Sequence, residues 1–117
     1  TGGGGGGQQE VASKMEQLSQ QSRELAERNR QAEGAILDQH RKHIHSTMQR
    51  VKQEMEILKK FEGKSISVNE YVDQLRDILG QKEREANDLS CILNEFEANL
   101  QEADFLSLRM DEMSLGT

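Results

Sequence analysis

The stretch that decides the fold runs from Val68 to Met110 and reads VNEYVDQLRDILGQKEREANDLSCILNEFEANLQEADFLSLRM. Every seventh residue forms a mainly apolar column, and a second apolar column follows it four residues later. The first column consists of Val68, Leu75, Lys82, Leu89, Phe96, Ala103 and Met110, and the second of Val72, Leu79, Ala86, Leu93 and Leu100. Such heptads are typical of a helix that packs along another helix. We therefore predict one long helix over residues 68–112.

The apolar face of this helix is wider than two columns. Five further apolar residues flank the seam: Tyr71, Ile78, Ile92, Leu106 and Met113. A two-column seam suits a two-stranded coil, whereas a wider face suits a helix with two neighbours, as in a small bundle. We expect this helix to meet more than one partner and to self-associate. The residues expected to carry self-association are Val68, Val72, Leu75, Leu79, Leu89, Leu93, Phe96 and Leu100.

The C-terminal part of the helix is apolar on more than one face and is flanked by acidic residues. It is either simply the helix end or a segment that docks onto another protein. The residues of this candidate docking segment are Phe105, Leu106, Leu108, Met110 and Met113.

The sequence predicts another long helix over residues 8–62, in which the isolated Gly34 is the one residue unfavourable to a helix. Ser22 and Asn29 occupy slots where leucine is expected, so this part is a weak coiled coil whose polar slots can fix register. Beyond Ile36 the apolar stripe continues only if the heptad slips in phase near residues 34–39. The stripe residues are Val11, Met15, Leu18, Leu25, Ala32 and Ile36, then Leu37, Ile44, Met48, Val51, Met55 and Leu58. We expect the methionines to fill gaps within stripes.

A break at residues 63–67 separates the two helices. Gly63 follows Lys59 and Lys60, which suits a helix C-terminus, and Ser67-Val68-Asn69-Glu70 has the spacing of a capping box. The short loop favours folding the second helix back along residues 36–62. We therefore predict an all-α fold of two long helices, a hairpin or coiled coil, that forms a dimeric coiled coil or a small bundle. Residues 1–7 are expected to be a flexible glycine-rich tract, native or an added linker, and residues 113–117 a tail.

Composition excludes most other classes. Of the 117 residues, 31% are charged and 33% apolar, and there is no Pro or Trp, which leaves too little bulky apolar volume for a compact core. The net charge of −6 argues against nucleic acid and acidic membranes, and no apolar run is long enough to span a bilayer. Residues 39–60 are locally positive, with six basic and two acidic residues. The chain starts without Met or a secretory signal, so we expect a fragment, and its lone Cys91 suits a reducing compartment.

Three motifs could in principle bind a ligand or react, but each is only a weak match. Gly63-Lys64-Ser65 ends like a phosphate-binding loop, but Leu58 stands where the first glycine is required. His40 and His43 could share a helical face, yet a tetrahedral metal site would need ligands from another chain. We expect His40 to be partly buried near the seam and the other two histidines to be solvated. Cys91 borders the apolar stripe and is expected to be a small buried thiol. We therefore expect no catalytic, cofactor or metal site in this chain.

Three motifs occur in the order seen in a known family. They are His40-Arg41-Lys42-His43-Ile44, Val51-x-x-Glu54-Met55 and Tyr71-Val72-x-x-Leu75-x-x-Ile78-Leu79. Over residues 35–104 the chain resembles the C-terminal region of the internal-motor kinesins, the kinesin-13 family. It departs from the family in its loop, which lacks the expected Pro and acidic character.

The resemblance implies a function for the parent protein. Kinesins of this family use ATP to remove tubulin from microtubule ends, and their C-terminal helices dimerise and regulate the motor. This chain would be such a tail, cytoplasmic and associated with the cytoskeleton or spindle, and ATP would bind only in a motor domain that it lacks. Its expected partners are a second copy, its own motor domain or an adaptor protein, and microtubules through the parent protein. The alternative is a generic coiled-coil scaffold or adaptor segment, and an enzyme is a third class that no motif favours.

Overall fold

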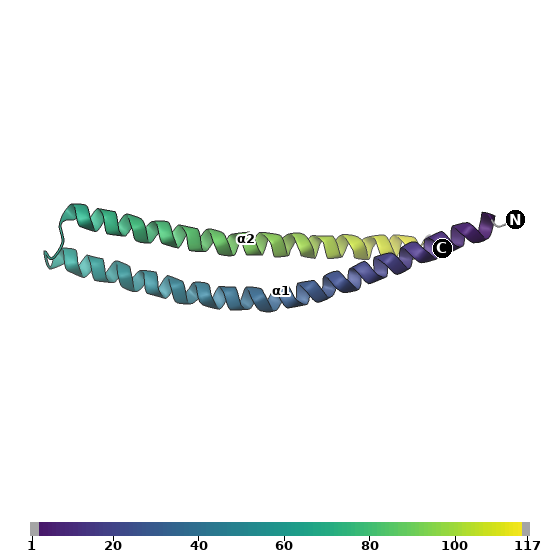
Figure 1. Ribbon diagram of the computed structural model, residues 1–117, viewed down its shortest axis with the longest axis horizontal. Helices are drawn as coiled ribbons and strands as arrows, with labels where there is room; N and C mark the ends of the chain where they lie inside the picture. Colours follow the sequence, from purple (N-terminus) through teal and green to yellow (C-terminus); the bar gives the residue numbers. More distant parts are fainter. Residues whose placement is uncertain (1–2, 116–117) are drawn as a thin grey trace. The chain divides into compact units, whose positions relative to one another are not determined.

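Two α-helices make up the described part of the chain. The computed structural model describes residues 3–115, in which α1 (Gly3–Glu62) and α2 (Val68–Leu115) are joined by the turn at residues 63–67 (Figure 1). No strand occurs within these residues, so the predicted all-α class of two long helices is confirmed. The heptad pattern and the lack of Pro explain why both helices run so far without interruption.

The helix ends differ from the predicted boundaries. Helix α1 already begins at Gly3, within the tract predicted to be flexible, and α2 continues to Leu115 rather than ending at residue 112. Adding residues to an existing helix avoids the cost of nucleation, which offsets part of the entropy that each glycine loses. Residues 1–2 of the predicted tract and residues 116–117 of the predicted tail lie outside the described residues.

The chain divides into two compact units. The hairpin unit is Ala35–Leu93 and contains the turn, the second part of α1 and the first part of α2. The terminal unit contains the described residues up to Gly34 and from Asn94 onward. Each unit pairs a piece of α1 with a piece of α2.

A Schellman motif ends α1. The amide of Ser65 donates to the Lys60 carbonyl at 2.7 Å, and the amide of Lys64 donates to the Phe61 carbonyl at 3.0 Å. The left-handed residue of this motif is Lys64, with φ of 61°, and not the neighbouring Gly63. Gly63 precedes it and fits closely, since a Cβ there would lie 3.2 Å from the Lys59 carbonyl oxygen.

The start of α2 is capped as predicted. The Ser67 hydroxyl accepts a hydrogen bond from the Glu70 amide at 3.1 Å, which is one half of a capping box. A second feature closes the turn: the rings of Phe61 and Tyr71 stack with centroids 4.8 Å apart. The aromatic pair was not predicted. The turn therefore holds the start of α2 against the end of α1.

The hairpin unit has a very small apolar core. Ile57 of α1 and Ile78 of α2 are its buried hydrophobic residues, and both line one small cavity between the helices. In this unit α2 lies antiparallel to α1, as the short loop predicted (Figure 1). Two buried isoleucines cannot by themselves account for a stable pair, so the remaining contacts of the two helices matter.

The terminal unit also has a small core, and part of it is polar. Leu25 is buried, and Asn29 is buried one helical turn further along. The Asn29 amide nitrogen donates to the backbone carbonyl of Asn99 at 3.4 Å, while its side-chain oxygen has no partner. Asn29 thus occupies a polar core slot, the position that its heptad spacing assigns to it.

One exposed ion pair in the terminal unit affects a titration. Arg30 donates to the Glu27 carboxylate through Nη2 at 2.7 Å and Nε at 3.1 Å. Chiefly these hydrogen bonds, and then the positive charge of Arg30, hold the pKa of Glu27 below its ordinary value. The small stabilisation from this pair is present above the ordinary pKa of a glutamate and is lost as the pH falls through the lowered pKa.

Candidate functional site

The face of α2 that packs on α1 is one continuous heptad seam. In the hairpin unit its residues are buried or half-buried, and they are Tyr71, Leu75, Ile78, Lys82, Glu85, Leu89 and Ile92. The seam combines the first predicted column with the residues that were predicted to flank it. The second predicted column is therefore left outside this seam.

Charged residues occupy the middle of this seam. Arg50 of α1 donates to one carboxylate oxygen of Glu85 through Nη2 at 2.9 Å and Nε at 3.1 Å, and these side chains are only 19% and 26% exposed. Lys82 of α2 reaches the Glu54 carboxylate at 3.3 Å. Each ion pair joins α1 to α2, so the contact between the helices is largely electrostatic at this point. The locally positive stretch at residues 39–60 thus meets a carboxylate of α2 at Arg50, whereas in the second pair the basic residue belongs to α2 and the acidic one to α1.

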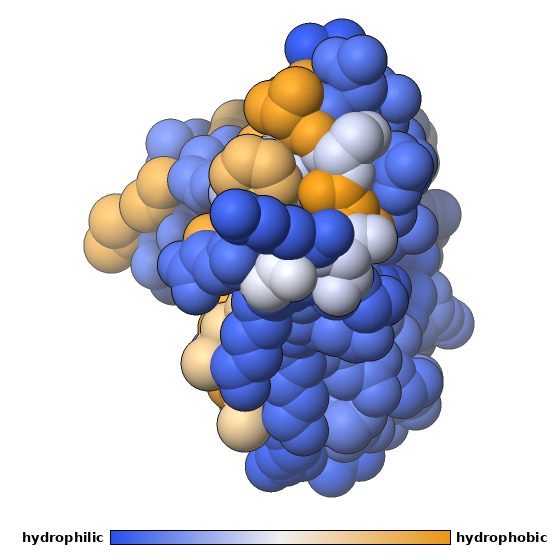
Figure 2. Space-filling view, turned by 90° about the vertical axis from the view of Figure 1, so that its left-hand side faces the viewer, coloured by the Kyte–Doolittle hydropathy of each residue, from blue (hydrophilic) through white to orange (hydrophobic). Residues whose placement is uncertain are grey.

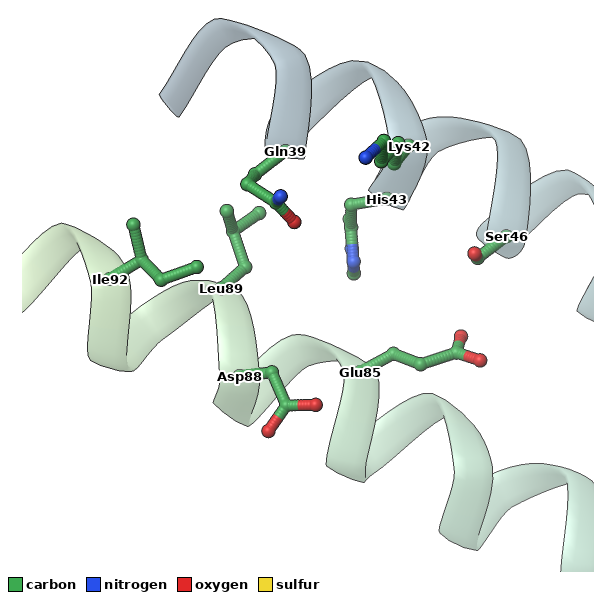
Figure 3. Close-up of a pocket in the computed structure, with 8 residues that line it drawn as sticks. All are labelled: Gln39, Lys42, His43, Ser46, Glu85, Asp88, Leu89 and Ile92. Carbon is green, nitrogen blue, oxygen red and sulfur yellow. The ribbon is translucent and has the colours of Figure 1, made fainter. Parts of the chain in front are cut away.

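A small cavity of about 150 Å³ lies next to these ion pairs. From α1 it is lined by Gln39, Lys42, His43 and Ser46, and from α2 by Glu85, Asp88, Leu89 and Ile92 (Figure 3). Figure 3 shows the His43 ring directed toward α2, between Leu89 and Glu85. Six of the eight lining residues are polar, and one of them, Glu85, is already paired with Arg50. The cavity is therefore a packing gap beside a polar seam and shows no set of reactive groups.

This arrangement corrects the predicted phase slip in α1. Without a slip, the seam continues at the same spacing from Ile36 through His43 and Arg50 to Ile57, all of which are buried or half-buried. The apolar residues that a slip would have placed in the seam are instead exposed, at 42–57% of their full surface, and we call them the α1 outer stripe: Leu37, Ile44, Met48, Val51, Met55 and Leu58. A slip would have unwound the coil and separated Arg50 from Glu85, whereas the regular register matches polar slots on both helices.

The α1 outer stripe also changes two smaller predictions. Met48 and Met55 are more than half exposed, so they do not fill gaps, whereas Met15, Met110 and Met113 are half-buried as gap-fillers should be. The partly buried histidine is His43, while His40 is exposed, because the register places position 43 in the seam.

The exposed part of the second predicted column of α2 is called the α2 stripe here. In the hairpin unit it consists of Val72, Leu79 and Leu93, and we include the exposed first residue of the first column, Val68; all four are between 42% and 57% exposed. Leu100 continues the sevenfold spacing in the terminal unit and is exposed as well. Of the residues predicted to carry self-association, the other three, Leu75, Leu89 and Phe96, are half-buried on the face toward α1.

Apolar side chains gather on one side of the hairpin when it is viewed from the turn, and the opposite side is almost entirely hydrophilic (Figure 2). Such a division is not needed for packing within the chain, because the seam lies between α1 and α2. Contiguous exposed apolar surface on a small protein marks an interaction site.

The candidate docking segment splits between the two faces of α2. Phe105 and Leu108 are 58% and 61% exposed, whereas Leu106, Met110 and Met113 are half-buried toward α1. A helix with a wide apolar face can use one half inside the chain and leave the other half outside. The exposed half here is too short to be identified as a second stripe.

The other motifs are placed as follows. In the Gly63-Lys64-Ser65 motif all three backbone amides donate to carbonyls of α1, so none is free to bind a phosphate. His45 is exposed beside Gln49, and no group of three His, Cys, Asp or Glu side chains within the described residues is arranged to hold a metal ion. Cys91 is exposed and not buried as predicted, because the register turns it away from the seam.

No protein-family model matches this chain, and no solved structure does. In the part of the chain that the structure describes, neither helix contains a stretch apolar enough to cross a membrane.

Proposed function

We propose that this chain is a non-catalytic self-association module in which two hairpins pair through the α2 stripe. One observation carries the proposal: Val72, Leu79 and Leu93 recur on α2 at multiples of seven residues, Val68 precedes Val72 by four, and all four are about half exposed, although the chain already has a complete seam elsewhere on this helix. Burying the exposed half of each such side chain contributes about 1 kcal/mol. Solvent exposure of so many regularly spaced apolar residues is unfavourable unless a partner covers them.

A second copy is the partner that best fits this stripe. The heptad spacing of the α2 stripe matches the spacing that the same stripe would present on another copy, which is the requirement for a two-fold symmetric contact. In such a dimer each α2 would have two neighbours, its own α1 and the partner's α2. This is the arrangement that its wide apolar face favours.

Sedimentation equilibrium tests the self-association. We expect the wild-type chain to reach twice its mass of 13.3 kDa as the concentration rises from micromolar to a few hundred micromolar. The double variant Val72→Asp/Leu79→Asp should stay monomeric, because each exposed carboxylate would have to be buried at the interface. A wild-type mass of 13.3 kDa at every concentration would show that the proposal is wrong.

The matched control is Asn87→Asp/Asn94→Asp. These residues are exposed on the same helix and do not belong to the α2 stripe, and the variant has the same change in charge. We expect it to dimerise like the wild type. Circular dichroism at equal concentration should show that both variants keep their helices.

We further propose that the module is the dimerisation and regulatory tail of a microtubule-depolymerising kinesin-like protein. The ordered motifs between His40 and Leu79 support this proposal, and the candidate docking segment would contact the motor domain or an adaptor. The alternative is a coiled-coil scaffold or adaptor segment unrelated to kinesins. The coding sequence around this chain distinguishes them: a motor domain with a phosphate-binding loop on the same polypeptide is expected for the first and absent for the second.

A further inference from the structure

We infer that two hairpin units pack face to face as an antiparallel four-helix bundle, in which the α1 outer stripe contacts the same stripe of a second copy. The inference rests on the proposed self-association through the α2 stripe and adds α1 to that interface. A second copy of this chain is therefore the partner that covers both stripes, and the turns of the two copies lie at opposite ends of the dimer.

The two stripes lie on the same side of the hairpin unit. Ile44, Val51 and Leu58 each follow a seam residue of α1 by one position, which turns them roughly 100° around the helix. Leu79 and Leu93 each follow a seam residue of α2 by four positions, which turns them roughly 40° in the same sense. Because the two helices are antiparallel, the same sense of rotation leads to the same side of the hairpin. Figure 2 shows this apolar side from the turn.

The surface between the two stripes adds no uncompensated charge in the middle of the hairpin unit. The α1 residues there follow a seam residue by four positions and are Thr47 and Glu54. Lys82 of α2 pairs with the Glu54 carboxylate at 3.3 Å, and the two side chains are only 35% and 26% exposed. A partner that covers both stripes therefore buries a charge pair that is already formed and largely shielded from water.

The area of the α2 stripe is too small for a stable dimer, whereas both stripes together suffice. The exposed half of an aliphatic side chain presents roughly 50–80 Å². The α2 stripe of the hairpin unit, with four such side chains, offers about 300 Å² at most. The α1 outer stripe adds six more, which brings the total to about 800 Å², the area that a specific dimer of standard size buries on each partner.

One two-fold axis can bring each stripe against its own copy. The ion pair between Arg50 and Glu85 marks one level along the hairpin. The midpoint of the α1 outer stripe lies two to three residues from Arg50, and that of the α2 stripe four to five residues from Glu85, so the midpoints are within about 10 Å of one level. An axis perpendicular to the helices at this level pairs α1 with α1 and α2 with α2, each antiparallel. An axis parallel to the helices that joined the α2 stripes would leave the α1 outer stripes on opposite sides.

Charge at the turn also favours opposite ends for the two turns. Residues 59–64 contain three lysines and one glutamate. Turns at the same end of a dimer would bring six lysines together, and like charges next to each other at an interface are unfavourable. The antiparallel bundle separates these groups along its length.

Sedimentation equilibrium of two matched variants tests whether α1 takes part in the interface. Val51→Asp/Met55→Asp should weaken dimerisation at least about tenfold relative to the wild type, because the partner would bury the new carboxylates. His45→Asp/Gln49→Asp adds two carboxylates with the same spacing at exposed positions outside both stripes, and it should dimerise like the wild type. Circular dichroism at equal concentration should show that both variants keep their helices.

The same measurement separates this inference from the proposed self-association. If Val51→Asp/Met55→Asp dimerises like the wild type while Val72→Asp/Leu79→Asp stays monomeric, self-association through α2 stands and the contact through α1 is wrong. The α1 outer stripe would then be free for a different partner. A wild-type mass of 13.3 kDa at every concentration would overturn both.

Spin-label distances in the dimer test the orientation without altering either stripe. In a Cys91→Ser background a nitroxide is attached at Glu83→Cys, near the middle of the α2 stripe, or at Asn69→Cys, beside the turn; both positions are exposed. The two labels at position 83 should lie within about 30 Å of each other across the bundle. The two labels at position 69 should be at least about 35 Å apart, because each lies about 17 Å from the stripe midpoint. Similar short distances at both positions would place the turns at the same end and overturn the inference.

Discussion

Lys64 has the least favourable backbone conformation among the described non-glycine residues, because it alone among them has a positive φ, at 61°. A residue with a Cβ loses roughly 1 kcal/mol or more in this conformation relative to glycine. We predict that Lys64→Gly increases the free energy of unfolding by about 0.5–1 kcal/mol. Urea denaturation at a fixed protein concentration measures the change.

Gly63→Ala is the matched comparison for Lys64→Gly. The added Cβ would meet the Lys59 carbonyl oxygen at 3.2 Å, so this variant should be less stable or unchanged and not more stable. If Lys64→Gly is destabilising, Lys64 does not have the left-handed conformation in solution.

At the residue scale the sequence predicted the cap at the start of α2 but not which residue of the turn has the left-handed conformation. The capping role of Ser67 follows directly from its spacing to Glu70, because a cap depends only on neighbouring residues. The sequence places Gly63 at the end of the first helix, and glycine is the residue that adopts the left-handed conformation most easily. The structure shows that hydrogen bonds from Lys64 and Ser65 to α1 decide which residue has this conformation. That choice depends on the whole turn and cannot be read from the preference of a single residue.

The ion pair between Arg50 and Glu85 is the main polar contact between α1 and α2. Replacing only one partner leaves a half-buried charge without its counterion, so Arg50→Leu and Glu85→Leu should each lower the free energy of unfolding by about 1–2 kcal/mol. The double variant should lose less than either single variant, because two leucines in facing seam slots pack together. Thermal and urea denaturation of the four proteins give the coupling free energy.

Glu27→Leu/Arg30→Leu provides the control for this pair. Those side chains are 50% and 74% exposed on the surface of α1, and removing them should leave the stability unchanged within error. A coupling as small as that of the exposed pair would mean that Arg50 and Glu85 do not meet across the seam.

At the element scale the periodicity of α2 predicted a long helix but did not identify which of its columns packs inside the chain. The sequence has two neighbouring columns of apolar residues, and both were assigned to the seam, including the more apolar one with Val72, Leu79 and Leu93. The structure uses the column that contains Glu85 and Asn99 instead. Its polar slots meet the polar slots of α1 at Arg50 and Asn29, so matching of polar groups outweighs total hydrophobicity.

The same reasoning explains the wrong phase slip in α1. A slip maximises the number of apolar residues in one stripe. The periodicity of α1 alone does not show which polar residues of α1 would then lose their partners on α2. With α2 in place, Arg50 and Glu54 have partners and the regular heptad is kept. Pairing between helices is a property of two sequences together, whereas periodicity is a property of one.

At the scale of the whole molecule, each helix of the hairpin unit has more apolar surface than one intrachain contact can bury. Polar and charged residues occupy much of the internal seam. Apolar residues remain exposed on both helices, among them Val72 and Leu79 on α2 and Val51 and Met55 on α1. A two-helix protein that is stable alone would have the opposite distribution, with apolar residues in the seam and polar residues outside. The observed distribution is the one expected for a module whose partners complete its hydrophobic contacts.

The most direct measurement is a nuclear Overhauser experiment on protein with labelled methyl groups and histidine rings, because it reports which side of α1 faces α2. We predict cross-peaks between the His43 ring and the Leu89 methyls, and none between the Val51 methyls and the methyls of α2 in the same chain. Cross-peaks from Val51 to the methyls of Leu75 or Leu79 within one chain, with none from His43, would contradict the polar seam and with it the exposed stripe on which the proposed self-association depends.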